Sequence, residues 1–298
     1  MTDRALRVGV AQTVTATRSV VTTRPAERSA QHLTVFCAEL GRVLGRPVEA
    51  FTVESYTALV EAMRNGGLDL AWLPPVVALR AASIGRATPL AMPVRQGVST
   101  FDAALFSREG SRFKELRDVF GARAAWVDKG SAAGHLVVRA SLRARGLGFE
   151  NAFSTETFCG SHDAVARAVL SGEADVGSTY LHLRPDGSIW RAGWGDARVQ
   201  IVDRVGPIPS DLIAGATSLP AELLRSVQQA LVGGADADLR RAANYWLECE
   251  GFVEVESSHL EPLASLLRYV DDTPQRMPSV FPRRRATPPS TRSGTGRR

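Results

Sequence analysis

Residues 56–75 read YTALVEAMRNGGLDLAWLPP, and this stretch decides the fold of the chain. Its first ten residues have the apolar period of an amphipathic helix. The two glycines that follow are typical of a helix end, and residues 68–73 form a short apolar strand. Pro74 and Pro75 are placed to open another helix. The segment therefore predicts a helix, a buried strand and a second helix in close succession.

The same alternation of strand and helix extends along the chain in both directions. Further strands are predicted at residues 6–11, 48–53, 104–106, 124–127, 174–178 and 199–202. Further helices are predicted at residues 26–44, 113–119, 134–145, 164–170, 220–231, 238–246 and 260–267. This order indicates an α/β fold with two units, each a largely parallel sheet with helices on both faces. Ligands of such sheets bind beyond the C-terminal ends of the strands.

The composition predicts a soluble globular protein. The chain has 298 residues, of which 44% are hydrophobic and 22% charged, and the length suits two domains. The net charge of +5 includes six arginines in residues 283–298, so the rest of the chain carries 5 − 6 = −1. A nearly neutral body argues against a nucleic-acid binder. Residues 277–298 are predicted to be a disordered, Arg-rich tail.

Cysteine use and the N-terminus bear on the compartment. The three cysteines, Cys37, Cys159 and Cys249, form no C-x-x-C pattern and are expected to be free thiols of a reducing compartment. Residues 1–10 lack the apolar core of a secretory signal. No apolar run approaches the roughly 18–20 residues that span a membrane. As written, the chain is expected to be cytoplasmic, or periplasmic if the start site is misassigned.

Several motifs carry a resemblance to a known family. They are residues 44–49 (LGRPVE), 56–73, 160–164 (GSHDA), 172–177 (GEADVG) and 206–211 (GPIPSD). Over roughly residues 6–235 the chain resembles the phosphonate, phosphate and phosphite solute-binding proteins of ABC importers.

The resemblance implies a bilobal fold of the periplasmic-binding-protein (Venus flytrap) type, with two doubly wound sheets. Two crossovers are expected near residues 99–105 and 200–208. Lobe 1 would comprise residues 6–98 and 208–275, and lobe 2 residues 99–207.

The loop at residues 128–134 could hold an anion. It lies between a predicted strand and a predicted helix, and its small residues let a ligand approach backbone N–H groups at a helix N-terminus. The loop residues in question are Ser131, Ala132, Ala133 and Gly134. Related proteins carry more hydroxyl groups here. The alternative interpretation is an ordinary helix cap at Ser131.

The resemblance implies further ligand contacts, each with a structural alternative. His162 matches a histidine that contacts the ligand, or it is a capping residue. Tyr56 matches a tyrosine that contacts the anion from the first lobe, or it is a half-buried core residue. Asp211 matches an acid that binds the ligand's amino group in relatives.

The remaining positions depart from the family pattern. A second acid of the family falls at His182, which would weaken a preference for aminoalkyl ligands. Tyr180 is close enough to offer a stacking face. Ser99 and Thr100 fall at the first crossover, where relatives carry an aromatic residue.

The sequence therefore predicts a monomeric solute-binding protein that closes on a small oxyanion, phosphate-like or phosphonate-like, without transforming it. No cofactor, metal or nucleic acid is expected. It would serve an ABC permease if secreted, or act as a cytoplasmic sensor or carrier. One alternative is an enzyme of the menaquinone-precursor or thiamin-pyrimidine type on the same fold, using Lys129 or His162. The other is an effector domain like those of LysR-type regulators.

Overall fold

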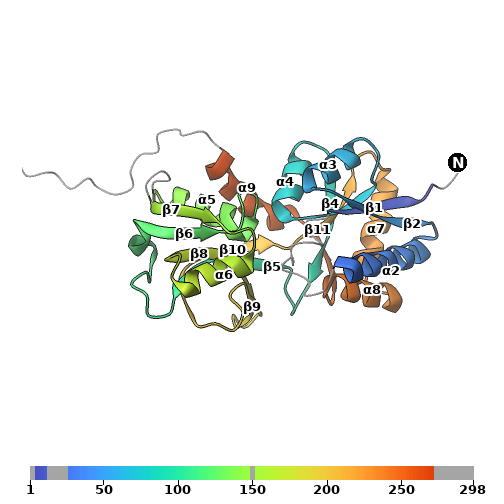
Figure 1. Ribbon diagram of the computed structural model, residues 1–298. Coiled ribbons are helices and arrows are strands. Elements are labelled where there is room, and N and C mark those ends of the chain that lie inside the picture. Colours follow the sequence, from blue (N-terminus) through green and yellow to red (C-terminus); the bar gives the residue numbers. More distant parts are fainter. Residues whose placement is uncertain (1–3, 12–25, 148–151, 272–298) are drawn as a thin grey trace, which may run out of the picture.

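The computed structural model describes residues 4–11, 26–147 and 152–271. The predicted tail at residues 277–298 lies outside these ranges. The strands form two six-stranded sheets, which make two lobes side by side (Figure 1). No described helix is both long enough and apolar enough to cross a membrane.

The first sheet is mixed rather than mainly parallel. Strand β1 pairs in parallel with β2 and β3, whereas β11 is antiparallel to both β3 and β4, and β12 is antiparallel to β4. The strands, in order across the sheet, are β12 (Gly251–Glu254), β4 (Ala87–Val94), β11 (Leu212–Ala216), β3 (Leu70–Leu73), β1 (Leu6–Ala11) and β2 (Val48–Val53).

Helices cover both faces of this sheet because its central strands are apolar on both sides. One face packs against α2 (Ala26–Leu44), α7 (Ala221–Val232) and α8 (Ala237–Leu247), with Phe36, Trp72 and Trp246 at the centre of that core. The other face packs against α3 (Tyr56–Arg64) and α4 (Pro75–Ser83). The ring centroids of Phe36 and Trp246 are 4.8 Å apart.

Helices also cover both faces of the second sheet. Its face with α5 (Val137–Ala144) and α9 (Ser257–Asp271) holds one core, and its face with α6 (His162–Ser171) holds another. Its strands, in order, are β10 (Val199–Pro209), β5 (Thr100–Arg108), β8 (Val176–Leu183), β6 (Ala122–Trp126) and β7 (Phe153–Phe158), with β9 (Ile189–Ala192) paired to β8.

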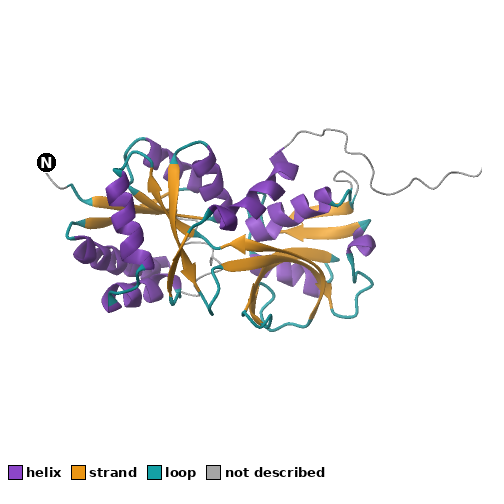
Figure 2. Cartoon of the chain, turned by 180° about the vertical axis from the view of Figure 1, so that it is seen from behind, coloured by secondary structure: helices purple, strands orange, loops and turns teal. Residues whose placement is uncertain are grey.

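Helix α9 corrects the predicted lobe assignment. The sequence assigned residues 208–275 to the first lobe, yet Leu263 and Leu267 of α9 are buried in the core of the second sheet with Val138 and Leu142. Figure 2 shows this helix lying over the second sheet, and Figure 1 places it beside α5. The boundary predicted between residues 207 and 208 falls inside β10. The chain thus crosses between the lobes a third time, after β12.

Local structure differs from the sequence-based expectation in two ways. The helix predicted at residues 113–119 is only a 3-10 turn, Leu116–Val119, because the Asp118 carboxylate accepts the N–H groups of Lys114 and Glu115. Strand β4 was not predicted because it contains Pro89 and Pro93, which cannot donate to a ladder. The strands β7, β9, β11 and β12 were also not predicted.

The two lobes repeat one structural unit. In the first lobe the Asp69 carboxylate accepts the N–H of Arg7 at 2.9 Å, just before β3. In the second, the Asp175 carboxylate accepts the N–H of Arg123 at 2.9 Å, just before β8. Helices α3 and α6 therefore hold equivalent places, and the sequence motifs GGLDLA and GEADVG mark the same turn in each lobe.

Candidate functional site

The chain crosses between the lobes at the same end of the strands in each sheet. Strand β4 ends at Val94 and β5 begins at Thr100, while β10 ends at Pro209 and β11 begins at Leu212. The N–H of Ser210 donates to the Ser99 carbonyl at 3.0 Å, which ties the two crossings together. We call residues 95–99 and 210–211, with the end of β8 beside them, the interlobe junction.

The strand registers bring the predicted site residues of the second lobe to this junction. Strands β5 and β8 are antiparallel, with Asp102 opposite Leu181, so the end of β8 lies beside the start of β5. Strands β6 and β7 are parallel and end together at Trp126 and Phe158. The loops after them lie at the edge where ligands of α/β sheets bind.

In the loop at residues 128–134, the Ser131 side chain caps the N-terminus of the helical segment that follows. The Ser131 hydroxyl accepts the N–H of Gly134 at 3.1 Å, and the Ala133 carbonyl accepts the Ser178 hydroxyl at 2.6 Å. Ala133 is buried and Ala132 half-buried. Gly134 is required here because a Cβ atom would lie 2.3 Å from Val127 Cγ2. The capping interpretation of Ser131 is thus confirmed, and a ligand-binding role for the same loop stays a prediction.

We expect the Ser131→Ala variant to lower the free energy of unfolding by about 1 kcal/mol, because the N–H of Gly134 would lose its acceptor. Chemical denaturation measures this. Ser226→Ala is the matched control, since the Ser226 hydroxyl bonds to the Glu222 carbonyl of its own helix and caps nothing. Equal stability of the Ser131 variant and wild type would contradict the capping role.

His162 is the first residue of α6, directly after the Ser161 cap. Its Nδ1 lies 2.7 Å from the Thr179 hydroxyl, and its ring meets Tyr180 edge-on with centroids 4.9 Å apart. Burial lowers the pKa of His162 to about 4. The imidazole is therefore neutral at pH 7 and offers an anion one N–H donor rather than a full positive charge.

Tyr180 joins His162 to a second buried histidine. The Tyr180 ring lies 5.5 Å from His182, which also contacts Phe101 and Trp190 at 5.5 and 5.3 Å between centroids. Burial raises the pKa of Tyr180, whose hydroxyl is also hydrogen-bonded to the side chain of Arg191. Burial, reinforced by nearby positive charges, lowers the pKa of His182 to about 3, so it too is neutral.

Asp211, Ser99 and Thr100 lie on the crossing segments. Burial raises the pKa of Asp211 to about 6, although the positive charge of Arg95 acts in the opposite direction. Thr100 pairs with Pro209 across the sheet. The structure thus brings these three residues to the junction with Tyr180 and His182.

Tyr56 lies on the first-lobe side. It follows the Ser55 cap of α3, as His162 follows the Ser161 cap of α6. It is half-buried against the core that includes Leu59 and Met63. Tyr56 and His162 hold equivalent positions in the two lobes. That they contact the same ligand stays a prediction.

Sequence reasoning missed the basic residues of the junction. Arg95 is only 5% exposed, and its Nε donates to the Leu247 carbonyl at 3.0 Å. Arg191 lies 3.4 Å from Glu248, an ion pair that joins the second lobe to the first. Burial lowers the pKa of Arg95. The sequence signal for Arg95 is its place directly after a strand at a crossover. That strand, β4, was not predicted because it contains two prolines.

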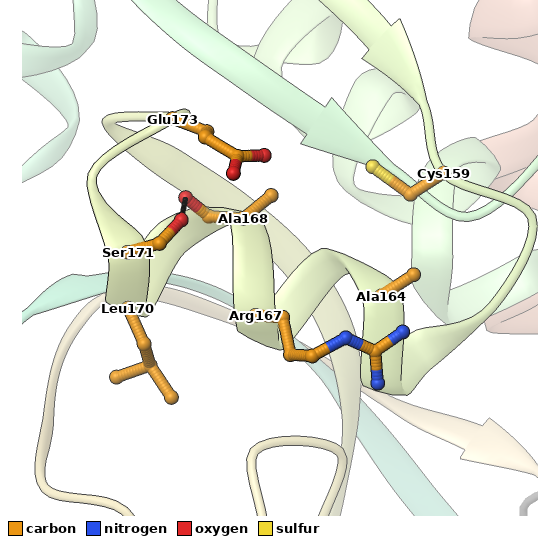
Figure 3. Close-up of a pocket in the computed structure, with 7 residues that line it drawn as sticks. All are labelled: Cys159, Ala164, Arg167, Ala168, Leu170, Ser171 and Glu173. Atoms are coloured by element: carbon orange, nitrogen blue, oxygen red, sulfur yellow. Dashed lines mark hydrogen bonds between the residues drawn. The ribbon is translucent and has the colours of Figure 1, made fainter.

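The surface also has a hollow that lies apart from the predicted ligand contacts. A hollow of about 550 Å³ lies along α6 and is lined by Cys159, Arg167 and Glu173 among others (Figure 3). Burial raises the pKa of the Cys159 thiol, which argues against a reactive thiolate there. None of the predicted ligand contacts lines this hollow.

The carboxylates of Glu39, Asp236 and Asp238 lie close enough together to hold a metal ion. The Arg42 guanidinium is already paired with Glu39 at 2.8 Å and with Asp236 at 2.5 Å. A positive charge thus occupies the cluster, which weakens it as a cation site.

Comparison with known proteins gives concordant results. Residues 19–260 match the family described as phosphonate periplasmic substrate-binding proteins of ABC transporters. The phosphate-import protein PhnD of Mycolicibacterium smegmatis is 25% identical over 231 residues, which cover 74% of this chain and 70% of that protein.

Solved structures share the fold. XAC2383 from Xanthomonas citri, solved with ATP, superimposes with a TM-score of 0.69 at 19% identity, covering 89% of this chain and 96% of that one. PhnD1 from Prochlorococcus marinus, solved with methylphosphonate, has a TM-score of 0.63 at 17% identity, covering 90% and 98%.

Proposed function

This chain belongs to the family of phosphonate periplasmic substrate-binding proteins of ABC transporters, and from that premise we propose that it binds a small phosphate-like or phosphonate-like oxyanion at the interlobe junction. The names of two similar proteins support the ligand class, since one imports phosphate and the other was solved with methylphosphonate. The family consists of substrate-binding proteins, which argues against the enzyme alternative.

The observation that carries the proposal is that two helix N-termini adjoin β8, one on each face of the second sheet. Successive residues of this strand hold the two loops: Ser178 bonds to Ala133, and Thr179 lies within hydrogen-bonding distance of His162. First-turn N–H groups have no acceptor within their own helix and carry a partial positive charge. Together with the His162 N–H, they suit the oxygens of a phosphoryl group.

Short crossing segments join the two lobes. Residues 95–98 form a tight turn, with Gln96 and Gly97 at φ of 49° and 76°. The Glu250 carboxylate accepts the N–H groups of both residues, at 3.0 and 3.2 Å. A ligand that contacts both lobes would favour the closed state by its differential affinity alone.

We expect His162→Ala to weaken binding of methylphosphonate or phosphate by roughly tenfold to a hundredfold, because a hydrogen bond to a charged group is lost. Isothermal titration calorimetry on the full chain measures the affinity. His259→Ala is the control, since His259 also lies near a helix start, that of α9, where its Nδ1 accepts the N–H of Glu256. Unchanged affinity of the His162 variant would place the anion elsewhere, and absence of binding by wild type to every oxyanion tested would refute the function.

We further propose that the chain works outside the cytoplasmic membrane, as a monomer that serves an ABC permease. The family's periplasmic description favours the periplasmic alternative over the cytoplasmic one. The free thiols are compatible with it. Burial raises the pKa of Cys37 to about 12 and of Cys249 to about 11, so both stay protonated and resist oxidation.

A further inference from the structure

Three buried nitrogen atoms at the interlobe junction have no hydrogen-bond partner among the described residues. They are Nη2 of Arg95, Nε2 of His182 and Nε1 of Trp190. The side chains of Arg95 and His182 are only 5% and 4% exposed. Leaving such a group buried and unsatisfied is destabilising. We call these three residues the donor cluster.

The three side chains come from three segments: Trp190 packs against His182, and Arg95 is near enough for its charge to act on His182. The ring centroids of His182 on β8 and Trp190 on β9 are 5.3 Å apart. The charge of Arg95, on the first crossing segment, acts on the His182 imidazole. The hydrogen bond from Arg95 Nε to the Leu247 carbonyl fixes the guanidinium.

The chemistry of the cluster specifies its missing partner. An arginine Nη and an indole Nε1 can only donate hydrogen bonds, and a neutral imidazole can donate through Nε2. The nearby carboxylates do not fill the role. Glu248 is paired with Arg191, and Asp211 acts on Arg95 through its charge, with no hydrogen bond between them.

Resting on the proposed function, we infer that the donor cluster binds a second oxyanionic group of the ligand, a carboxylate joined by a short linker to the phosphonate. A carboxylate offers two acceptor oxygens to Arg95 Nη2, Trp190 Nε1 and His182 Nε2. An ammonium group only donates hydrogen bonds and cannot serve these three donors, and the nearby Asp211 carboxylate already interacts with the opposite charge of Arg95. The site therefore discriminates against aminoalkyl phosphonates.

The test compares three probes on the full chain by calorimetry: methylphosphonate, phosphonoacetate and 2-aminoethylphosphonate. We expect phosphonoacetate to bind at least roughly tenfold more tightly than methylphosphonate, and 2-aminoethylphosphonate to bind no better than methylphosphonate, as follows from one added charged hydrogen bond. Trp190→Phe keeps an aromatic ring but removes the N–H. This variant should lose most of the gain for phosphonoacetate and leave methylphosphonate binding unchanged.

Trp194→Phe is the matched control, because Trp194 lies on the neighbouring segment and packs on Phe106 with centroids 5.0 Å apart. Equal affinity for methylphosphonate and phosphonoacetate would overturn the carboxylate subsite and leave the proposed function intact. Tighter binding of 2-aminoethylphosphonate would overturn it as well. If Trp190→Phe weakens both probes equally, the donor role of Trp190 is wrong. If no probe binds wild type, the proposed function fails and the subsite fails with it.

Discussion

The Gly193→Ala variant should lose about 3 kcal/mol of stability and most of its ligand affinity. Gly193 lies against β8, where a Cβ atom would sit 1.8 Å from Thr179 Oγ1 and 2.8 Å from Thr179 Cβ. Thr179 is fully buried and cannot move aside freely. Overpacking a tight core typically costs roughly 1–3 kcal/mol, and this contact lies at the severe end. Because Thr179 holds His162 at 2.7 Å, the displacement reaches the proposed oxyanion site.

Denaturant unfolding and calorimetry with methylphosphonate measure the two effects. Gly251→Ala is the matched control, since a Cβ atom at Gly251 meets nothing within 4 Å. The double variant Gly193→Ala/Thr179→Ala removes the 1.8 Å contact and should be less destabilised than the sum of its single changes. Strict additivity would show that the clash with Thr179 is not the cause.

Acidification from pH 6 to pH 4 should destabilise the protein through the buried histidines. Their ordinary pKa is 6.5, and burial lowers it to about 4 in His162 and about 3 in His182. In this range the unfolded chain therefore binds two protons that the folded chain excludes, and stability falls as pH falls. Asp211 acts oppositely, since its pKa is raised from 3.8 to about 6 and the folded state holds its proton.

The two histidines and Asp211 together make the unfolded chain bind about one proton more than the folded chain. The free energy of unfolding therefore falls by about 1.4 kcal/mol for each pH unit of acidification through these three groups. His182→Phe should make their combined slope nearly flat, and Asp211→Asn should roughly double it. Unfolding free energies at several pH values, compared between wild type and the variants, isolate these groups from the surface carboxylates. A slope unchanged in His182→Phe would show that His182 is not excluded from protonation in the folded state.

Part of the candidate site could be foreseen from sequence. Ser131 follows a predicted strand and precedes a predicted helix, and His162 lies just before another predicted helix, so both fall where ligands of α/β sheets bind. The capping role of Ser131 and the half-buried setting of Tyr56 were both among the alternatives. The neutral state of His162 could not be foreseen, because it results from packing against Tyr180 and Thr179, which approach from a different strand.

The donor cluster was out of reach of sequence reasoning for a similar cause. Arg95 is held by the carbonyl of Leu247, which is 152 residues away in the chain. Trp190 lies outside all of the family motifs in the sequence. Contacts between residues distant in the chain, rather than any local pattern, leave their nitrogen atoms buried without partners among the described residues.

By itself, the sequence determined the α/β alternation and the helix–strand–helix segment at residues 56–75, because apolar periodicity and glycine or proline signals act between near neighbours. The segment is indeed α3, β3 and α4. Only the tertiary structure decided that the first sheet is mixed, that α9 packs on the second lobe and that nitrogen atoms of Arg95, His182 and Trp190 are buried without partners among the described residues. These features depend on strand pairing and burial between distant residues, and burial sets both the pKa values and the unsatisfied donors at the junction.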